Sequence, residues 1–439
     1  YRAALPWGDG SRHLYALPGN HDWYDGLTSF LRVFCQKDWV GGWKTHQSRS
    51  YFALQLPHRW WLWGIDIQFD SYIDQPQLDY FDLVVGPMVQ PGDSIILCSA
   101  KPTWVKSNRN RPEDYVNLDY FDRKIIRKRG AEARLFLTGD THHYARYEQE
   151  DGGRQLVTAG GGGAYLSATH DLPERLELPP SQSRDPGKTR PPTYYRLAET
   201  FPSRETSRRL KRRVITLPFT NTGFWALMGL VHMLFGWMAA GALSGGGVAI
   251  SERLSNRSIG GLLDAVAHSP IAVGAAIATV LALVSFTQEP SPRRRWVIGS
   301  LHGVVQLVMV VVTIRLAAVA MAGIDGIAYW LGYFAILAVP GGLLGSLVLA
   351  LYLIVADHWS CNSNELFASQ RIQDYKNFLR LHLAEDGTLT VYPVGVEKVC
   401  RRWKLATEGE PSDSWLEPVD AQPPFLIEPP VAIQPSRPA

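Results

Sequence analysis

The feature that most constrains the fold is a long apolar segment in the middle of the chain. Only ten of the 138 residues from 219 to 356 are charged. Four stretches within it carry no charge: Gly223–Leu243, Ala265–Gln288, Trp296–Ile314 and Gly326–Ala356. Because about 20 apolar residues in a helix cross a bilayer core, we predict a four-span transmembrane domain over residues 219–357. Pro340 lies near the middle of the fourth stretch, so we interpret that stretch as one kinked span, with five spans in total as the alternative.

Basic residues predict how these spans are oriented. A basic juxtamembrane segment (201–218) precedes the first span, Arg293–Arg295 separate the second from the third, and Arg371, Lys376 and Arg380 follow the fourth. With four spans, all three basic sites fall on one side, which the positive-inside rule makes cytoplasmic. We therefore predict a multi-pass protein of the cytoplasmic (inner) membrane, with the N-terminal domain and the C-terminal tail in the cytoplasm.

The remaining residues have the composition of a soluble protein. Residues 1–200 alternate short β-rich runs with helical patterns, which predicts a layered α/β domain. Residues 358–408 predict a small cytoplasmic segment, with a helical start at Phe367–Leu383 and a strand at Gly387–Val394. Residues 409–439 are rich in proline and acid, and we expect them to be disordered. Since the chain opens at Tyr1, we expect it to be a fragment of a longer protein.

Charge and cysteine usage exclude some classes of function. The net charge of +3 indicates no nucleic-acid partner. The four cysteines are widely spaced, which matches neither a zinc finger nor a disulfide framework.

A first polar cluster, Gly19-Asn20-His21-Asp22, follows the apolar run Leu14–Leu17. An amide oxygen is a neutral metal ligand, and an imidazole can donate a proton to a phosphoryl oxygen while a carboxylate orients it. A plain polar turn is the alternative interpretation of these four residues alone.

A second cluster, Gly139-Asp140-Thr141-His142-His143, follows the predicted strand Leu135–Thr138. Asp140 and His142 are two residues apart on a loop, so both side chains can face one centre. A carboxylate oxygen and an imidazole nitrogen suit Zn, Mn or Fe. Both clusters follow strands of one domain, and ligands of open α/β sheets gather at that edge.

These residues resemble the calcineurin-like metallophosphoesterase superfamily, in a membrane-attached bacterial-type branch. Gly19–Asp22 matches its Gly-Asn-His-Asp block, and Gly139–His142 matches its Gly-His-x-His block with Asp140 in place of histidine. The resemblance covers residues 1 to about 170 and implies a partial β-sandwich flanked by helices.

The resemblance also implies roles for the site residues and a cofactor. Asn20, Asp140 and His142 would be metal ligands of two divalent ions (Mn, Fe or Zn) in the intact protein. His21 would act on the scissile phosphate as acid or charge stabiliser with Asp22 behind it, and His143 would support the ligands. Asp66 and Gln75 would belong to the segment between the matched blocks.

Two features depart from that pattern. The fourth block of the superfamily is His-x-Pro, whereas this chain has Ala100 at the ligand position. The first two blocks would lie upstream of Tyr1, so the fragment by itself is expected to be inactive.

We therefore predict a membrane-tethered, metal-dependent phosphatase, a hydrolase of phosphomonoesters or phosphodiesters that uses a metal-bound hydroxide. Its partners would be a phosphorylated small molecule or a lipid head group, and the membrane. The alternative is a degenerate, non-catalytic phosphoesterase fold that binds a phosphorylated ligand or a partner. A transporter has only Arg315 and the interrupted last span in its favour.

Overall fold

The computed structural model describes residues 12–68, 72–109, 111–181, 191–244, 249–405 and 416–436. The chain divides into two compact units: residues 1–205 with 373–439, and residues 206–372. Gly8-Asp9-Gly10 and the start of the chain lie outside the described residues.

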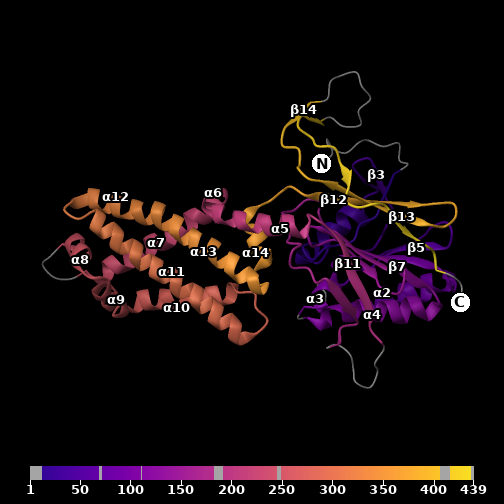
Figure 1. The fold of residues 1–439 in the computed structure, drawn as a ribbon, viewed down its shortest axis with the longest axis horizontal. Coiled ribbons are helices and arrows are strands. Elements are labelled where there is room, and N and C mark those ends of the chain that lie inside the picture. The colour runs from indigo at the N-terminus through magenta and orange to yellow at the C-terminus, as the bar shows by residue number, and fades with distance from the viewer. Residues whose placement is uncertain are drawn as a thin grey trace. The chain divides into compact units, whose positions relative to one another are not determined.

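The first unit is built mainly of β-strands (Figure 1). Its strands are β1 (His13–Leu14), β2 (Trp39–Val40), β3 (Trp43–Thr45), β4 (Phe52–Gln55), β5 (Trp60–Gly64), β6 (Ser94–Ser99), β7 (Glu132–Thr138), β8 (Tyr144–Gln149), β9 (Gln155–Ala159), β10 (Arg175–Leu178), β11 (Thr193–Phe201), β12 (Lys376–Leu383), β13 (Leu389–Val396), β14 (Trp403–Leu405), β15 (Leu416–Pro418), β16 (Phe425–Leu426) and β17 (Val431–Ile433). Its helices are α1 (Thr28–Phe30), α2 (Gln75–Asp79), α3 (Thr103–Ser107) and α4 (Val116–Phe121), and α5 (Arg204–Lys211) crosses into the second unit.

An eight-stranded mixed sheet forms the centre of this unit, in the order β10-β11-β8-β9-β7-β6-β5-β4. Strands β5, β6, β7 and β9 are parallel to one another, and the outer pairs are antiparallel. The buried apolar runs predicted as strands are these parallel strands, because parallel strands covered on both faces need apolar side chains throughout. The mixed α/β class is thereby confirmed.

Alternation along β5 divides the core between the two faces of the sheet. Trp61 and Trp63 pack on one face with Phe81 and Phe121, from the segments that contain α2 and α4. Trp60 lies on the opposite face and is fully buried. The tryptophans of β5 are therefore core residues. Side chains alternate between the two faces of a strand, and both faces of β5 are covered.

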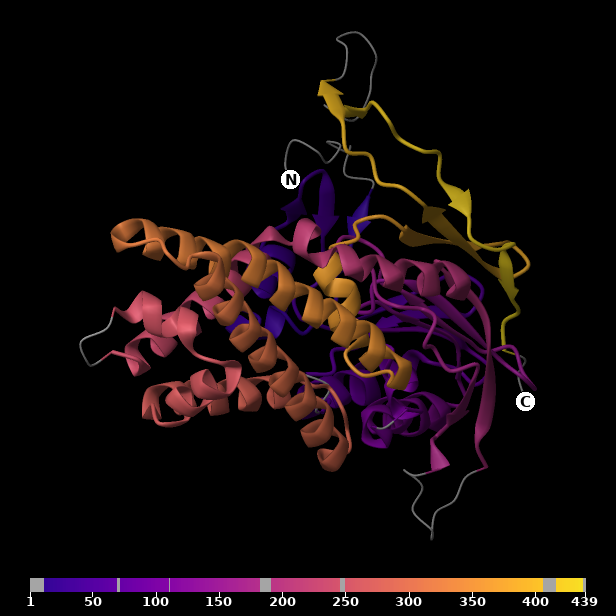
Figure 2. The ribbon, with the colours of Figure 1, turned by 60° about the vertical axis from the view of Figure 1, so that its left-hand side comes forward.

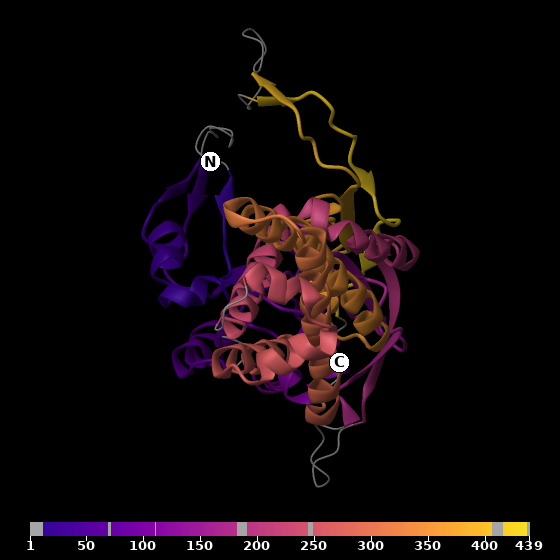
Figure 3. The same cartoon turned by 90° about the vertical axis from the view of Figure 1, so that its left-hand side faces the viewer.

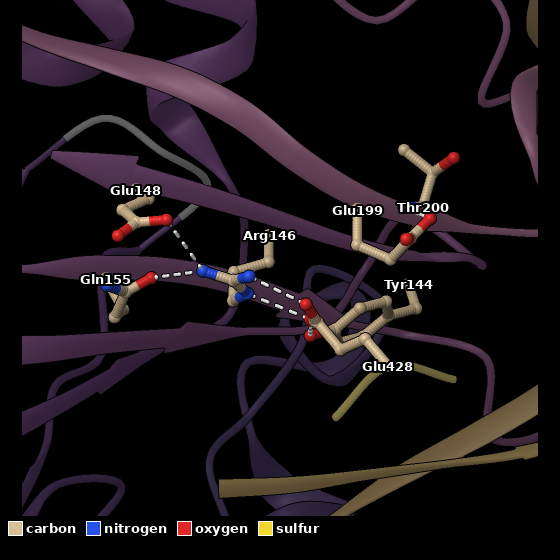
Figure 4. Close-up of polar contacts among 7 residues, drawn as sticks. All are labelled: Tyr144, Arg146, Glu148, Gln155, Glu199, Thr200 and Glu428. Carbon is tan, nitrogen blue, oxygen red and sulfur yellow. Dashed lines mark hydrogen bonds and ion pairs between the residues drawn. The ribbon is translucent and has the colours of Figure 1, made fainter. Parts of the chain in front are cut away.

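The C-terminal strands cover that opposite face (Figure 2). Strand β13 pairs with β12, β16 and β17, and Val391 and Ile433 share a hydrophobic cluster with Trp60. The Trp60 Nε1–H donates to the Gly387 carbonyl at 2.9 Å, and Glu428 pairs with Arg146 (Figure 4).

These contacts correct three sequence-based expectations. Residues 373–405 belong to the first unit, not to a separate segment. The helical pattern at 367–383 ends at Gln370, and residues 376–383 form β12, because their apolar side chains have a sheet to pack on. The described part of the expected disordered tail, 416–436, contains β15, β16 and β17, which are fixed by pairing and by burial of Ile433.

The second unit consists of helices (Figures 1 and 3). They are α6 (Leu217–Thr220), α7 (Thr222–Ala242), α8 (Ile250–Asn256), α9 (Ile259–Ala267), α10 (Pro270–Phe286), α11 (Pro292–Ala320), α12 (Gly326–Ile336), α13 (Gly342–Ala356) and α14 (Ser363–Gln370). Helix α13 packs beside α7 and α11, and α10 packs beside α11. Arg315 lies in α11, and its Nη1 donates to the Ser255 carbonyl at 2.8 Å.

Among the residues that the structure describes, three helical segments are long and apolar enough to cross a membrane: Thr222–Ala242, Pro292–Ala320 and Gly326–Trp359. The pair α9–α10 meets the same criteria only as a whole, and it is bent by 97°. The segment around Pro340 continues from α12 to α13 without interruption, which agrees with one kinked span.

Candidate functional site

The Gly19–Asp22 loop is a tight turn fixed by its own aspartate. The Asp22 Oδ2 accepts a hydrogen bond from the Gly19 N–H at 2.8 Å, and Asp22 begins a short 3₁₀ turn that ends at Asp25. His21 is exposed, and its ring lies 4.8 Å from the Tyr24 ring. The Asp22 carboxylate therefore holds the loop backbone, a role that the sequence did not suggest.

The strand that precedes this loop differs from the sequence-based expectation. Only His13–Leu14 form a strand, β1, and it pairs with β3 in a small separate sheet. The loop is tied to the main sheet through Trp23 instead, whose Nε1–H donates to Asp66 Oδ1 at 3.2 Å. Asp66 is the second residue after the end of β5 and is 3 % exposed. Burial raises the pKa of this carboxyl group, while hydrogen bonds from Ser50 and Trp23 oppose the increase.

The Gly139–His143 loop leaves the carboxyl end of β7, as predicted. Asp140 has a φ of +60°, a left-handed conformation that aspartate tolerates better than most residues. The His142 N–H donates to Ser167 Oγ at 3.1 Å, and the His142 ring meets the Tyr165 ring edge-on at 4.8 Å. Backbone and ring contacts thus fix His142 in one position.

Gly160 allows this loop to pack against the end of β9. A β-carbon at Gly160 would lie 2.1 Å from the Thr141 carbonyl oxygen and 3.1 Å from the Gly139 carbonyl carbon. No side chain fits there, so this glycine is needed for close backbone approach. Gly160, the first residue of the glycine run Gly160–Gly163, is therefore part of the packing around the second cluster.

The two clusters influence each other electrostatically. Burial lowers the pKa of His142, the charge of Asp140 opposes this shift, and the charges of Lys376 and His21 add to it. His142 is therefore neutral near pH 7 and retains a nitrogen lone pair. His21 lies 121 positions before His142 in the sequence and is among the charged groups that act on His142.

The donor atoms are of the right kind for a metal ion but too few. Asn20, Asp140 and His142 offer an amide oxygen, a carboxylate oxygen and an imidazole nitrogen. Within the described ranges, however, no three histidine, cysteine, aspartate or glutamate side chains converge to hold a metal ion. Ala100 lies directly beside the second cluster, since its carbonyl accepts the Gly139 N–H at 3.0 Å, and its methyl group cannot bind metal. Among the described residues, Asn20, Asp140 and His142 are therefore an incomplete set of metal ligands.

His143 does not face this site. It is 3 % exposed, and burial lowers its pKa to about 4, with Asp171 and Arg109 as its charged neighbours. Gln75 starts α2, where its Nε2 donates to Asp79, so it has a local structural role.

The C-terminal strand β12 contributes residues that sequence reasoning missed. Asn377 donates its N–H to the Gly161 carbonyl at 3.2 Å, and its Oδ1 accepts the Gly161 N–H at 3.4 Å. The neighbouring Lys376 Nζ donates to the Ala164 carbonyl. No sequence signal links this strand to the clusters, because more than 200 residues separate them.

A pocket of about 400 Å³ opens beside the glycine run. It lies between the ends of β6, β7 and β9 and strand β12, and its lining is Cys98, Ser99, Leu137, Thr138, Ala159, Gly162, Asn377, Phe378 and Leu379. Burial raises the pKa of Cys98 to about 12, so this thiol is protonated at neutral pH. The lining contains no charged side chain.

Comparisons of the chain with family models, with curated proteins and with solved structures return no match. The resemblance to the metallophosphoesterases and the activity that it implies therefore stay predictions.

Proposed function

We propose that this chain carries a phosphoester hydrolase domain attached to a membrane. The observation that supports this best is that both polar loops are held at the ends of central parallel strands. The first is held through the hydrogen bond of Trp23 to Asp66, and the second through that of the Gly139 N–H to the Ala100 carbonyl. Histidine and carboxylate side chains on such loops can transfer protons and stabilise charge on a phosphoryl group.

The chain's own residues have distinct parts in this proposal. The exposed His21 imidazole would donate a hydrogen bond or a proton to a phosphoryl or leaving-group oxygen. Asp22 holds the turn that presents it. Divalent ions (Mn, Fe or Zn) would neutralise phosphoryl charge and supply hydroxide when bound. Asn20, Asp140 and His142 are the residues proposed to contact them, together with further ligands from outside this set.

The test is hydrolysis of p-nitrophenyl phosphate and bis-p-nitrophenyl phosphate by the full-length gene product, with Mn, Zn or Fe added in turn. We expect His21→Ala to lower kcat by roughly 10²-fold or more, the usual contribution of a general acid. His382→Ala is the matched control, because His382 is an exposed histidine of β12 with no contact to the two loops. Absence of metal-dependent turnover in the unmodified protein would overturn the proposal.

The second candidate is a non-catalytic domain that binds a phosphorylated ligand. Ala100, at the position where a ligand histidine is expected, favours it, as does the incomplete donor set. Phosphate binding without turnover under any of the three metals would select this candidate.

We further propose that residues 206–372 cross the membrane four times. Lys211 precedes the first apolar helix, and its Nζ lies 2.8 Å from Asp357 Oδ2 at the end of the last one. Residues on both sides of this segment also pack into one soluble unit. Both ends therefore lie on the same side of the bilayer, which requires an even number of crossings. The bent pair α9–α10 then counts as a span rather than as a re-entrant loop.

The basic residues at 204–213 and 293–295 support the proposal that this shared side is the cytoplasm, in an inner-membrane protein. The substrate would be a phosphorylated small molecule or a lipid head group, and we propose no nucleic-acid partner.

A further inference from the structure

Lys376 is held at the candidate site by the strand that follows the membrane-spanning segment. It opens β12 and pairs in register with Val396 of β13. The next residue, Asn377, is 3 % exposed and makes two hydrogen bonds with Gly161. These contacts fix the β12 backbone against the glycine run, and the Lys376 Nζ reaches the Ala164 carbonyl at the end of that run.

The same loop leads directly to the second cluster. Tyr165, which follows Ala164, contacts the His142 ring edge-on at 4.8 Å. The Lys376 Nζ is thus bonded to the residue that precedes the Tyr165 ring. Two nitrogen-bearing side chains from distant segments, His142 and Lys376, therefore contact the same short stretch, Ala164–Tyr165.

The charge of Lys376 is not used in an ion pair. Asp374 is its acidic neighbour, but the Asp374 carboxylate accepts from Arg401 Nη2 at 3.1 and 3.2 Å and from the Val399 N–H. Within the part of the chain that the structure describes, Lys376 has no carboxylate at salt-bridge distance. An ammonium group has three N–H donors, so bonding to one carbonyl leaves donors for an incoming anion.

We propose that Lys376 is a substrate-binding residue that holds the phosphoryl oxygens of the ligand, so that the C-terminal segment completes a site begun by residues 139–142. This inference depends on the proposed function for the identity of the ligand, a phosphate monoanion or dianion. Charge-assisted hydrogen bonds from lysine to phosphate are strong enough to set affinity. From the sequence alone, Lys376 was only one of the basic residues that predicted the orientation of the membrane spans.

The test measures binding apart from turnover. Inorganic phosphate is titrated by calorimetry into the full-length protein in detergent, once with Mn²⁺ and once with a chelator. We compare the unmodified protein with Lys376→Met, Lys376→Arg and the control Lys398→Met, whose lysine is exposed in the same unit. A titration with short-chain phosphatidic acid distinguishes a lipid head group from a soluble ester.

We expect Lys376→Met to weaken phosphate binding roughly tenfold to a hundredfold, the effect of losing a hydrogen bond to a charged group. Lys376→Arg should restore most of the affinity, and Lys398→Met should leave it unchanged. Weaker binding of phosphate or of phosphatidic acid by Lys376→Met supports the inference. The ligand that the unmodified protein binds more tightly shows whether the phosphoryl group comes from a soluble ester or from a lipid head group. If Lys376→Met does not fold, the phosphate affinity of Lys376→Arg decides. A partial loss of this affinity at an unchanged unfolding temperature supports the inference.

Failure of this inference and failure of the proposed function give different outcomes. Unchanged phosphate affinity in folded Lys376→Met overturns the role of Lys376, even if the protein hydrolyses phosphoesters. Phosphate binding that needs Lys376, without turnover, retains the inference and rejects the hydrolase. No phosphate binding by the unmodified protein rejects both.

Discussion

Arg146 and Glu428 form a bidentate ion pair, although 282 positions separate them in the sequence. The Arg146 Nε–H and Nη2–H donate to Glu428 Oε1 and Oε2 at 2.8 and 2.6 Å, and the Tyr144 hydroxyl donates to Oε1 at 2.5 Å (Figure 4). Only 10 % of the Arg146 side chain and 7 % of the Glu428 side chain are exposed. This ion pair connects the C-terminal strands to the main sheet.

Replacing Glu428 by alanine should destabilise the first unit. Arg146 would keep Gln155 and the half-exposed Glu148 as partners but would lose its buried counter-charge. Removing one member of a buried pair costs about 3 kcal/mol. The measurement is urea unfolding followed by tryptophan fluorescence.

Glu417→Ala is the matched control for Glu428→Ala. Glu417 pairs with Lys404 at 3.0 Å, but 35 % of the Glu417 side chain and 58 % of the Lys404 side chain are exposed, so this change should cost about 0.5 kcal/mol or less. Equal stability of the two variants would contradict the anchoring role of Glu428.

Gly160→Ala should disrupt the candidate site, because the added methyl group would collide with the Thr141 carbonyl. We expect a loss of about 1–3 kcal/mol in unfolding free energy, as for other overpacked positions. Gly163→Ala, in the same run, meets open space and should change stability by about 0.5 kcal/mol at most. Thermal unfolding of both variants checks this, and a tolerated Gly160→Ala would contradict the close approach.

Asp66→Asn should stabilise the protein at neutral pH. Burial raises the pKa of the Asp66 carboxyl group above its usual 3.8, so the unfolded state loses this proton at a lower pH than the folded state does. The stability linked to the protonated group is present below pH 3.8 and is lost as the pH rises through the folded-state pKa. Asparagine has no such titration and keeps an oxygen acceptor for Trp23.

The measurement for Asp66→Asn is the unfolding temperature from pH 3.5 to 8, with the exposed Asp38→Asn as the control. The advantage of Asp66→Asn should grow as the pH rises and then level off. An advantage that is constant over this range would show that burial of the charge is not its cause.

Four crossings predict the sidedness of the connecting loops. Ser291, before α11, should lie on the same side as the soluble unit, and Asp325, before α12, on the opposite side. Cysteines introduced singly at these positions should react with a membrane-impermeant maleimide from opposite sides of sealed vesicles. Labelling of both from one side would reject the four-span arrangement.

Local sequence patterns determined much of this protein. The uncharged stretches predicted the apolar helices, because a run of about 20 apolar residues has few other stable environments. The short apolar runs predicted the central parallel strands, whose two covered faces need such residues. The sequence also identified both polar loops.

Only the tertiary structure decided what completes the core and the candidate site. Strands β13 and β17 pack on the main sheet of the first unit, because Trp60, Val391 and Ile433 bury one another across more than 300 positions. The same packing brings Lys376 to the Ala164 carbonyl, next to the Tyr165 ring that contacts His142. Local periodicity gives the conformation of a segment but not the distant surface that it covers, and at Lys376–Leu383 that surface turned an expected helix into a strand.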